Sequence, residues 1–270
     1  MEPIKFPPLI LSSWEETRDR IHKYCRLVGA IREVLSEPLS NALHTNLLLC
    51  RKGITTSALP RGEKSAGQTF EVIIEMNRTR LCIESNYREP LHIALTGQSL
   101  NALCDETCSL LTDIGIKPPL DRPSFLEGTR GKFDKGHVKA YWRALKSTNR
   151  IFKQIKSRLP GDSSPIQLHV DTLVVSLTWY CKDFFQSSTI EEIDFGFSTG
   201  DGLFPEARFF IQSFPDKREL KNVLAHEPSD FVVKCNSKLI LPYSEVSKTN
   251  SGDALLYNFF KSAYGSIATR

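Results

Sequence analysis

Apolar residues recur at every third or fourth position in several stretches of the chain, and this spacing predicts amphipathic helices. The first is expected at residues 13–36, where Ser13 and Glu16 have the spacing of a capping box and Pro38 ends the pattern. Further helices are expected at residues 99–115, 136–159 and 253–269. Each of these would bury one apolar stripe.

Short runs rich in leucine, isoleucine, valine and threonine lie between these helices and predict strands. They fall at residues 46–50, 54–57, 69–74, 80–84 and 90–95, and later at 166–180, 206–214 and 231–241. Close turns between neighbouring runs favour antiparallel pairing. The sequence therefore predicts an α+β fold of two related helix–antiparallel strands–helix halves, packed as one compact body. Similar helix-to-strand junctions in the two halves indicate an internal duplication.

Proline, glycine and charged residues concentrate at residues 117–136. Such a composition is typical of a linker. We therefore expect a first α+β half at residues 1–116 and a second at residues 137–270.

The charge balance is mild, with 35 lysines and arginines against 31 acidic residues and a net charge of +4. No polybasic run is present, so neither nucleic acid nor a membrane is an expected partner, and the segment Arg130–Lys132 is the weakest of the binding hypotheses. Prolines interrupt the apolar run of the N-terminal segment, so we expect no signal peptide. The 7 cysteines lie mostly in apolar segments, as reduced thiols do in a cytoplasmic protein.

Established catalytic signatures are missing from the sequence, so no cofactor is expected and the question of catalysis stays open. Cys104 and Cys108 have i,i+4 spacing on a predicted helix and could form half a metal site, although core packing explains them as well. His169 and Asp171 would share one face of a strand. Neither pair has an assignable further ligand, and we expect no metal.

A polar stripe on the first predicted helix is the main candidate for binding chemistry. Arg18, His22, Cys25, Gly29 and Arg32 share one helix face. A mid-helix glycine costs about 1 kcal/mol relative to alanine, so Gly29 is expected to allow a strand or ligand to approach closely. His22 and Arg32 could then point donors into a cleft, or the stripe could be a solvated helix shoulder.

Other polar residues could complete this cleft. His44 precedes the first strand, Thr55 and Thr56 follow the turn at Gly53, and Glu191 opens an acidic, glycine-containing segment that could close over a site or connect two strands. Histidines with an arginine favour an anionic ligand. The tentative ligand-binding set is therefore His22, Arg32, His44, Thr55, Thr56 and Glu191.

Many of these positions, taken together, resemble an uncharacterised and mostly bacterial family classified as a domain of unknown function, family number 5996. The resemblance spans nearly the whole chain and is carried by several short motifs. They are Trp14, His22, Val28–Gly29, Arg32, Pro38–Leu39, His44, Gly53, Thr55–Ser57, Pro60, Tyr141–Arg143, Arg150, Ser164–Pro165, Gly196–Phe197 and Leu241–Tyr243. The resemblance implies no reaction or cofactor.

This chain also departs from the family pattern. It has Asn41 and Gln167 where the family typically carries histidines. Residues 170–174, which end at Val174, read Val-Asp-Thr-Leu-Val where the family has Trp-Gly-Ser-Phe-Asp. If those positions carried chemistry, this chain has lost or altered it.

Two functions are therefore expected as alternatives. The first is a small-molecule binding protein or enzyme with a polar cleft for an anion in the first half. The second is a non-catalytic module for protein interaction, with loop aromatics such as Phe184, Phe185 and Phe204 meeting a protein partner.

Overall fold

The computed structural model describes residues 5–39, 43–62, 65–181, 192–202, 204–214, 233–235 and 238–268. It has an α+β fold with antiparallel sheet, as predicted. The chain forms two compact units that are interleaved in sequence. Unit 1 consists of Met1–Leu11, Arg143–Gln167 and Val174–Arg270, and unit 2 of Ser12–Trp142 and Leu168–Leu173. The units therefore do not part at the expected linker.

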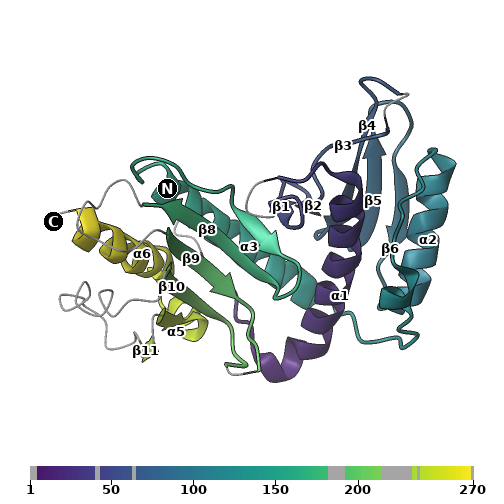
Figure 1. The fold of residues 1–270 in the computed structure, drawn as a ribbon. Helices are drawn as coiled ribbons and strands as arrows, with labels where there is room; N and C mark the ends of the chain where they lie inside the picture. The colour runs from purple at the N-terminus through teal and green to yellow at the C-terminus, as the bar shows by residue number, and fades with distance from the viewer. Residues whose placement is uncertain are drawn as a thin grey trace. The chain divides into compact units, whose positions relative to one another are not determined.

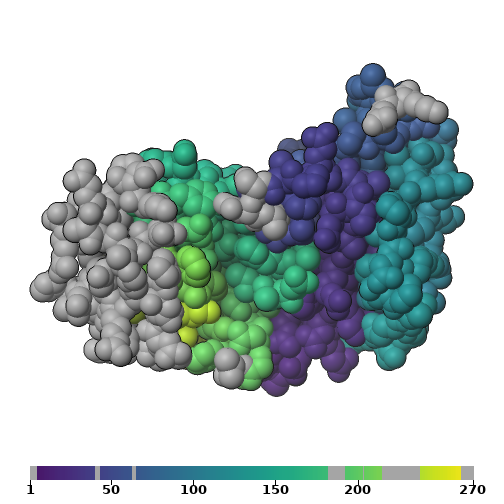
Figure 2. All heavy atoms as spheres, viewed as in Figure 1, coloured from purple at the N-terminus to yellow at the C-terminus, as the bar shows by residue number. Residues whose placement is uncertain are grey.

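Helices α1 (Leu11–Leu35) and α2 (Leu100–Asp113) run alongside the strands of unit 2 in Figure 1. Their atoms adjoin on the face of unit 2 that Figure 2 shows. α1 begins two residues before the predicted cap, so Ser13 lies inside its first turn. The last proline before the helix is Pro8, and Leu11 is therefore free to adopt helical geometry. α2 starts as a capped helix should, since the Ser99 hydroxyl accepts from the Ala102 N–H at 3.3 Å.

The sheet of unit 2 is an antiparallel meander in the order β1-β2-β4-β5-β6, with β3 paired to β4. The strands are β1 (Leu47–Leu49), β2 (Gly53–Thr55), β3 (Leu59–Pro60), β4 (Thr69–Glu75), β5 (Arg80–Ser85) and β6 (Leu91–Ala94). Alternation sends Phe70, Val72 and Ile74 of β4 to one face of the sheet and Glu71 and Glu75 to the other. One face is consequently apolar and the other carries charge.

The expected linker packs as part of unit 2. It contains the short 3-10 helix η2 (Arg122–Phe125), whose Phe125 is buried. The Gly131 N–H donates to the Gly97 carbonyl at 3.0 Å, and the ring of Phe133 lies 5.6 Å from that of Tyr24. Proline and glycine here belong to a segment that packs within one unit. Amino-acid composition alone does not distinguish such a segment from a linker between two units.

The strands of unit 1 pair antiparallel in the order β11-β12-β10-β9-β8. Helix α3 (Lys135–Lys156) enters this unit at Arg143, and α5 (Tyr243–Lys248) and α6 (Gly252–Ala268) follow the last strand. The strands are β8 (Val174–Tyr180), β9 (Glu192–Ser198), β10 (Arg208–Phe214), β11 (Val233–Cys235) and β12 (Lys238–Pro242). The order helix, strands, helix thus recurs along the chain; a duplication as its origin stays a prediction.

Two elements differ from the prediction. The acidic segment expected to be a loop is the inner strand β9, because Ile193, Phe195 and Phe197 alternate as buried residues and outweigh the acids. The expected strand at 166–180 is broken into β7 (Gln167–His169) and β8 by a turn in which Leu173 has φ +52°. Asp171 lies in this turn, so it does not share a strand face with His169 as predicted.

Aromatic side chains form the core of unit 1. Phe6 from the N-terminal segment packs on Phe209 and Tyr243, with ring centroids 5.9 and 6.0 Å apart, and the Tyr243 hydroxyl donates to the Pro7 carbonyl at 2.6 Å. Aromatic pairs in such geometry stabilise by about 0.5–1.5 kcal/mol beyond the area they bury. These contacts tie the start of the chain to its end. None of the described helices has the length and apolar character needed to cross a membrane.

Candidate functional site

Arg32 lies at the centre of the predicted site and is almost fully buried. Its Nε donates to the His44 carbonyl at 3.1 Å, and its Nη1 donates to the Thr56 carbonyl. Burial lowers the pKa of Arg32. The guanidinium thus joins α1 to the chain on either side of β1 and β2, and it brings Arg32, His44 and Thr56 together through backbone atoms.

The two threonines are engaged within the sheet. The Thr56 hydroxyl accepts from the Val72 N–H at 3.0 Å and donates to the Ser57 carbonyl at 2.8 Å. The Thr55 hydroxyl donates to the Glu71 carboxylate and accepts from the Ser57 N–H at 2.8 Å. Both hydroxyls therefore stabilise the turn after β2, where Ser57 has φ +62°.

His22, also on α1, contacts a different segment of unit 2 from the one that Arg32 contacts. Its Nε2 lies 2.8 Å from the Val170 carbonyl, in the turn between β7 and β8. Burial lowers its pKa, and Arg26 adds to this effect, whereas the hydrogen bond to Val170 opposes it. Gly29 meets the same turn, because a Cβ there would lie 2.6 Å from Val170 Cγ1. The predicted close approach at Gly29 is confirmed, and the approaching group is Val170.

A groove of about 360 Å³ adjoins this turn on unit 2. It bears one cation, Arg26, and three carboxylates, Glu33, Asp121 and Asp171. This excess of negative charge disfavours an anionic ligand. Of the remaining predicted residues, the His44 ring accepts from the Leu39 N–H at 3.2 Å, and Glu191 lies outside the described residues, as does Asn41.

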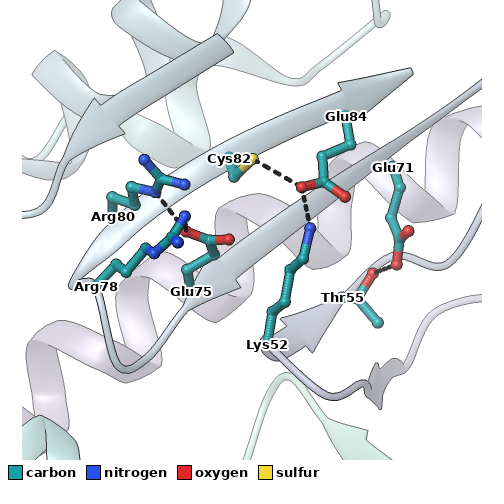
Figure 3. A network of polar contacts seen from close by, with 8 residues as sticks. All are labelled: Lys52, Thr55, Glu71, Glu75, Arg78, Arg80, Cys82 and Glu84. Atoms are coloured by element: carbon teal, nitrogen blue, oxygen red, sulfur yellow. Dashed lines mark hydrogen bonds and ion pairs between the residues drawn. The ribbon is translucent and has the colours of Figure 1, made fainter. Parts of the chain in front are cut away.

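The charged face of the unit 2 sheet holds the network of polar contacts shown in Figure 3. Glu75 of β4 is 3% exposed and pairs with Arg80 across the β4–β5 hairpin, with Arg78 at 3.9 Å. Lys52, in the β1–β2 turn, pairs with Glu84 of β5. The Lys52 ammonium lowers the pKa of Glu84 through this contact. Each carboxylate of the pair Glu75 and Glu84 thus has its own cation.

Among the described residues, this face also provides a group that could be considered for a metal. Ligand atoms of Glu75, Cys82 and Glu84 lie within 4.8 Å of one another. Burial raises the pKa of the Cys82 thiol to about 12, so the thiolate that a metal needs is costly to form. The two carboxylates are already neutralised by Arg80 and Lys52. The arrangement is that of a structural ion-pair network.

Helix α3 presents a different kind of surface. Its 22 residues contain lysines and arginines but neither aspartate nor glutamate. Within unit 1, Arg143, Lys146, Arg150 and Lys153 recur at spacings of three and four and so share one helix face. On the opposite side, Leu145, Phe152 and other apolar residues are buried.

A groove of about 410 Å³ follows this basic face. The described residues that line it share hydrogen-bond donors on their side chains, and they are Lys146, Asn149, Arg150, Lys153, Gln154 and Ser157. Its volume falls within the range of small-molecule sites, about 300–1,000 Å³. We call these residues the α3 basic groove. Sequence reasoning looked for consecutive basic residues and missed it, although the i,i+3,i+7 spacing and the absence of acids were visible.

The aromatic residues predicted to meet a protein partner provide little support for such an interface. Phe184 and Phe185 lie outside the described residues. The Arg208 guanidinium lies 4.9 Å from the centre of the Phe204 ring, which is 36% exposed. This local cation–π contact accounts for Phe204 without a partner.

The fold and these surfaces define an α+β protein with antiparallel strands and a basic helical groove. The chain belongs to a family of unknown function, DUF5996, whose pattern matches residues 6–270. Comparison with curated proteins and with solved structures gave no match.

Proposed function

We propose that this protein binds a small anionic molecule, such as a phosphorylated or polycarboxylate metabolite, in the α3 basic groove. The observation that carries the proposal is the convergence of Lys146, Arg150 and Lys153 on one groove of a helix without acidic residues. Arginine offers a planar fork that suits phosphate, and lysine adds a mobile charge. An anion there gains from several cations at once.

The rest of the groove supports a compact ligand over an extended one. Asn149, Gln154 and Ser157 add neutral donors close to the cations, which suits the oxygen-rich periphery of a phosphate ester. The side chains stand on a helix whose apolar face is committed to the core of unit 1. A buried apolar face cannot insert into a lipid surface. The basic face is therefore better suited to bind a small anion than a membrane.

Arg32, Thr55 and Thr56 have a different role under this proposal. Their donors are directed at carbonyl and carboxylate oxygens of unit 2, so they hold the turn and strands that the family pattern includes.

Thermal unfolding with inorganic pyrophosphate, adenosine triphosphate, inositol hexakisphosphate and citrate tests the proposal. A ligand that binds the native state at 100 times its Kd adds about 2.7 kcal/mol of stability, so at least one compound should raise the Tm measurably. The double variant Lys146→Gln/Arg150→Gln should weaken the Kd by at least about tenfold, the equivalent of about 1.4 kcal/mol.

The matched control is Lys117→Gln/Lys261→Gln, which removes the same charge at exposed positions. It should leave the Kd within about twofold, because neither lysine lines the groove and exposed charges that do not contact the ligand are largely screened at physiological ionic strength. No response to any of the anions, or equal weakening by both double variants, would overturn the proposal.

A further inference from the structure

Two cysteines and an arginine meet on unit 2. Cys104 and Cys108 lie one turn apart on α2, and their thiols form a side-chain hydrogen bond. Arg122 of η2 places its Nη1 at 2.8 Å from the Cys104 sulfur and 3.7 Å from the Cys108 sulfur. Its Nη2 pairs with Asp105, which fixes the guanidinium beside the thiols.

The two thiols differ in exposure and in acidity. Cys104 is buried, whereas Cys108 is partly exposed. The hydrogen bond from Cys104 and the charge of Arg122 lower the pKa of Cys108 to about 6, against the opposing effects of burial and Asp105. The same hydrogen bond, together with burial, raises the pKa of Cys104. The pair therefore releases one proton readily and retains the other.

The other described cysteines with shifted acidity behave in the opposite way. Burial raises the pKa of Cys25 and Cys82, and it raises that of Cys181 to about 11. Such thiols are inert packing groups. Arg122 lies beside both sulfurs of the pair, and Cys108 is the one of the two that solvent can reach.

We propose that Cys108 is a reactive thiolate that a hydroperoxide oxidises, and that Cys104 then closes a disulfide with it. In the first step the Cys108 sulfur attacks one peroxide oxygen, so an S–O bond forms, the O–O bond breaks and the alkoxide or hydroxide leaves and takes a proton from water. In the second step the Cys104 thiol attacks the sulfenic sulfur, so the S–S bond forms, the S–O bond breaks and water leaves with the Cys104 proton.

Cys104 and Cys108 lie on the same side of α2, and the same Arg122 nitrogen reaches both sulfurs. Cβ atoms four residues apart on a helix lie about 5–6 Å apart, whereas a disulfide joins Cβ atoms about 3.5–4.5 Å apart. The second step therefore requires the turn of α2 between the two cysteines to tighten. Closure of the disulfide would release Arg122 from the thiols, leaving its ion pair with Asp105.

Alkylation by iodoacetamide at pH 6, read residue by residue by mass spectrometry, tests the thiolate. Cys50 is the control, because it is also partly exposed. At pH 6 about half of the Cys108 thiols would be ionised against less than about 1% of ordinary ones, and the lower nucleophilicity of an acidic thiol leaves an advantage of about tenfold. Equal rates at Cys108 and Cys50 would overturn the proposal.

Hydrogen peroxide tests the oxidation. The peptide that carries both cysteines should lose two hydrogens by mass, while Cys25, Cys82 and Cys181 remain free thiols. In Cys104→Ser the product should instead be a Cys108 sulfenic acid that dimedone traps, and in Cys108→Ser no adduct should form at Cys104. Arg122→Gln should slow alkylation of Cys108 at pH 6, and Arg122→Lys should restore part of the rate. Oxidation of Cys104 in the absence of Cys108, or no disulfide in the intact chain, would refute the mechanism.

Discussion

Gly29 of α1 and Val170 of the β7–β8 turn pack so closely that a Cβ at position 29 would lie 2.6 Å from Val170 Cγ1 and 3.1 Å from its Cβ. The contact holds a segment that is distant in sequence against the first helix. Valine is stiff about χ1, so its methyl groups cannot easily move away.

The variant Gly29→Ala should therefore be less stable, although alanine is the better helix former. Overpacking costs about 1–3 kcal/mol, which exceeds the roughly 1 kcal/mol gained in helix propensity. Urea unfolding would measure the loss. Gly128→Ala is the control, because a Cβ there meets no atom within 4 Å. Adding Val170→Ala should return part of the lost stability; strict additivity of the two changes would contradict this explanation.

Arg32→Met should destabilise the protein more than an ordinary arginine replacement. It leaves the carbonyls of His44 and Thr56 without their donor. A buried acceptor that loses its partner costs about 1–3 kcal/mol, so a loss of about 2–4 kcal/mol is expected for the two. Arg51→Met, at an exposed position, should stay within about 0.5 kcal/mol of the wild type. Similar losses in the two variants would argue against a structural role for Arg32.

Arg78 and Arg80 both lie near the buried carboxylate of Glu75, and their replacement should lower the stability by very different amounts. Replacing Arg80 by methionine leaves Glu75 buried without its main cation, and breaking a buried pair costs about 3–5 kcal/mol. Arg78 is 68% exposed at its side chain and lies 3.9 Å away, so Arg78→Met should cost less than about 1 kcal/mol. Chemical unfolding of the two variants side by side gives the comparison, and an Arg78 effect as large as that of Arg80 would contradict it.

His22 should make stability depend on pH on the acid side. Its folded pKa lies below the ordinary value of 6.5, mainly because of burial, so the unfolded chain binds protons more readily. The contribution of neutral His22 is complete above pH 6.5 and declines as the pH falls towards the folded pKa. Unfolding at pH 7.5 and 5.5 should show a smaller pH effect in His22→Gln than in the wild type. An equal pH effect in His22→Gln and in the wild type would contradict this assignment.

The four longer helices, most strands and the α+β class could be predicted because local periodicity determines them, whereas the short helix α5 was not expected. β9 could not, since acids and glycines obscured the alternation of Ile193, Phe195 and Phe197, and Gly196 proved to be the place where the Phe210 ring packs. That contact joins two strands across the sheet. The two partners lie on different strands, so the periodicity of either strand alone does not reveal the contact.

The candidate site was harder to predict for a related reason. A polar residue on a helix has the same appearance in sequence whether it meets a ligand or a carbonyl. Arg32 and His22 each meet a backbone oxygen supplied by a distant segment. The α3 basic groove was accessible in principle, because its pattern lies within one helix, but only if charge is counted along a helix face instead of along the chain.

The interleaving of the two units has a consequence for synthesis on the ribosome. Unit 2 is complete once Leu173 has emerged, whereas unit 1 opens with the first residues and still awaits the strands β8 to β12 and helix α6. Domains tend to fold as units during translation. Phe6 and Pro7 are therefore synthesised early but gain their contacts with Phe209 and Tyr243 only after all of unit 2 has been made.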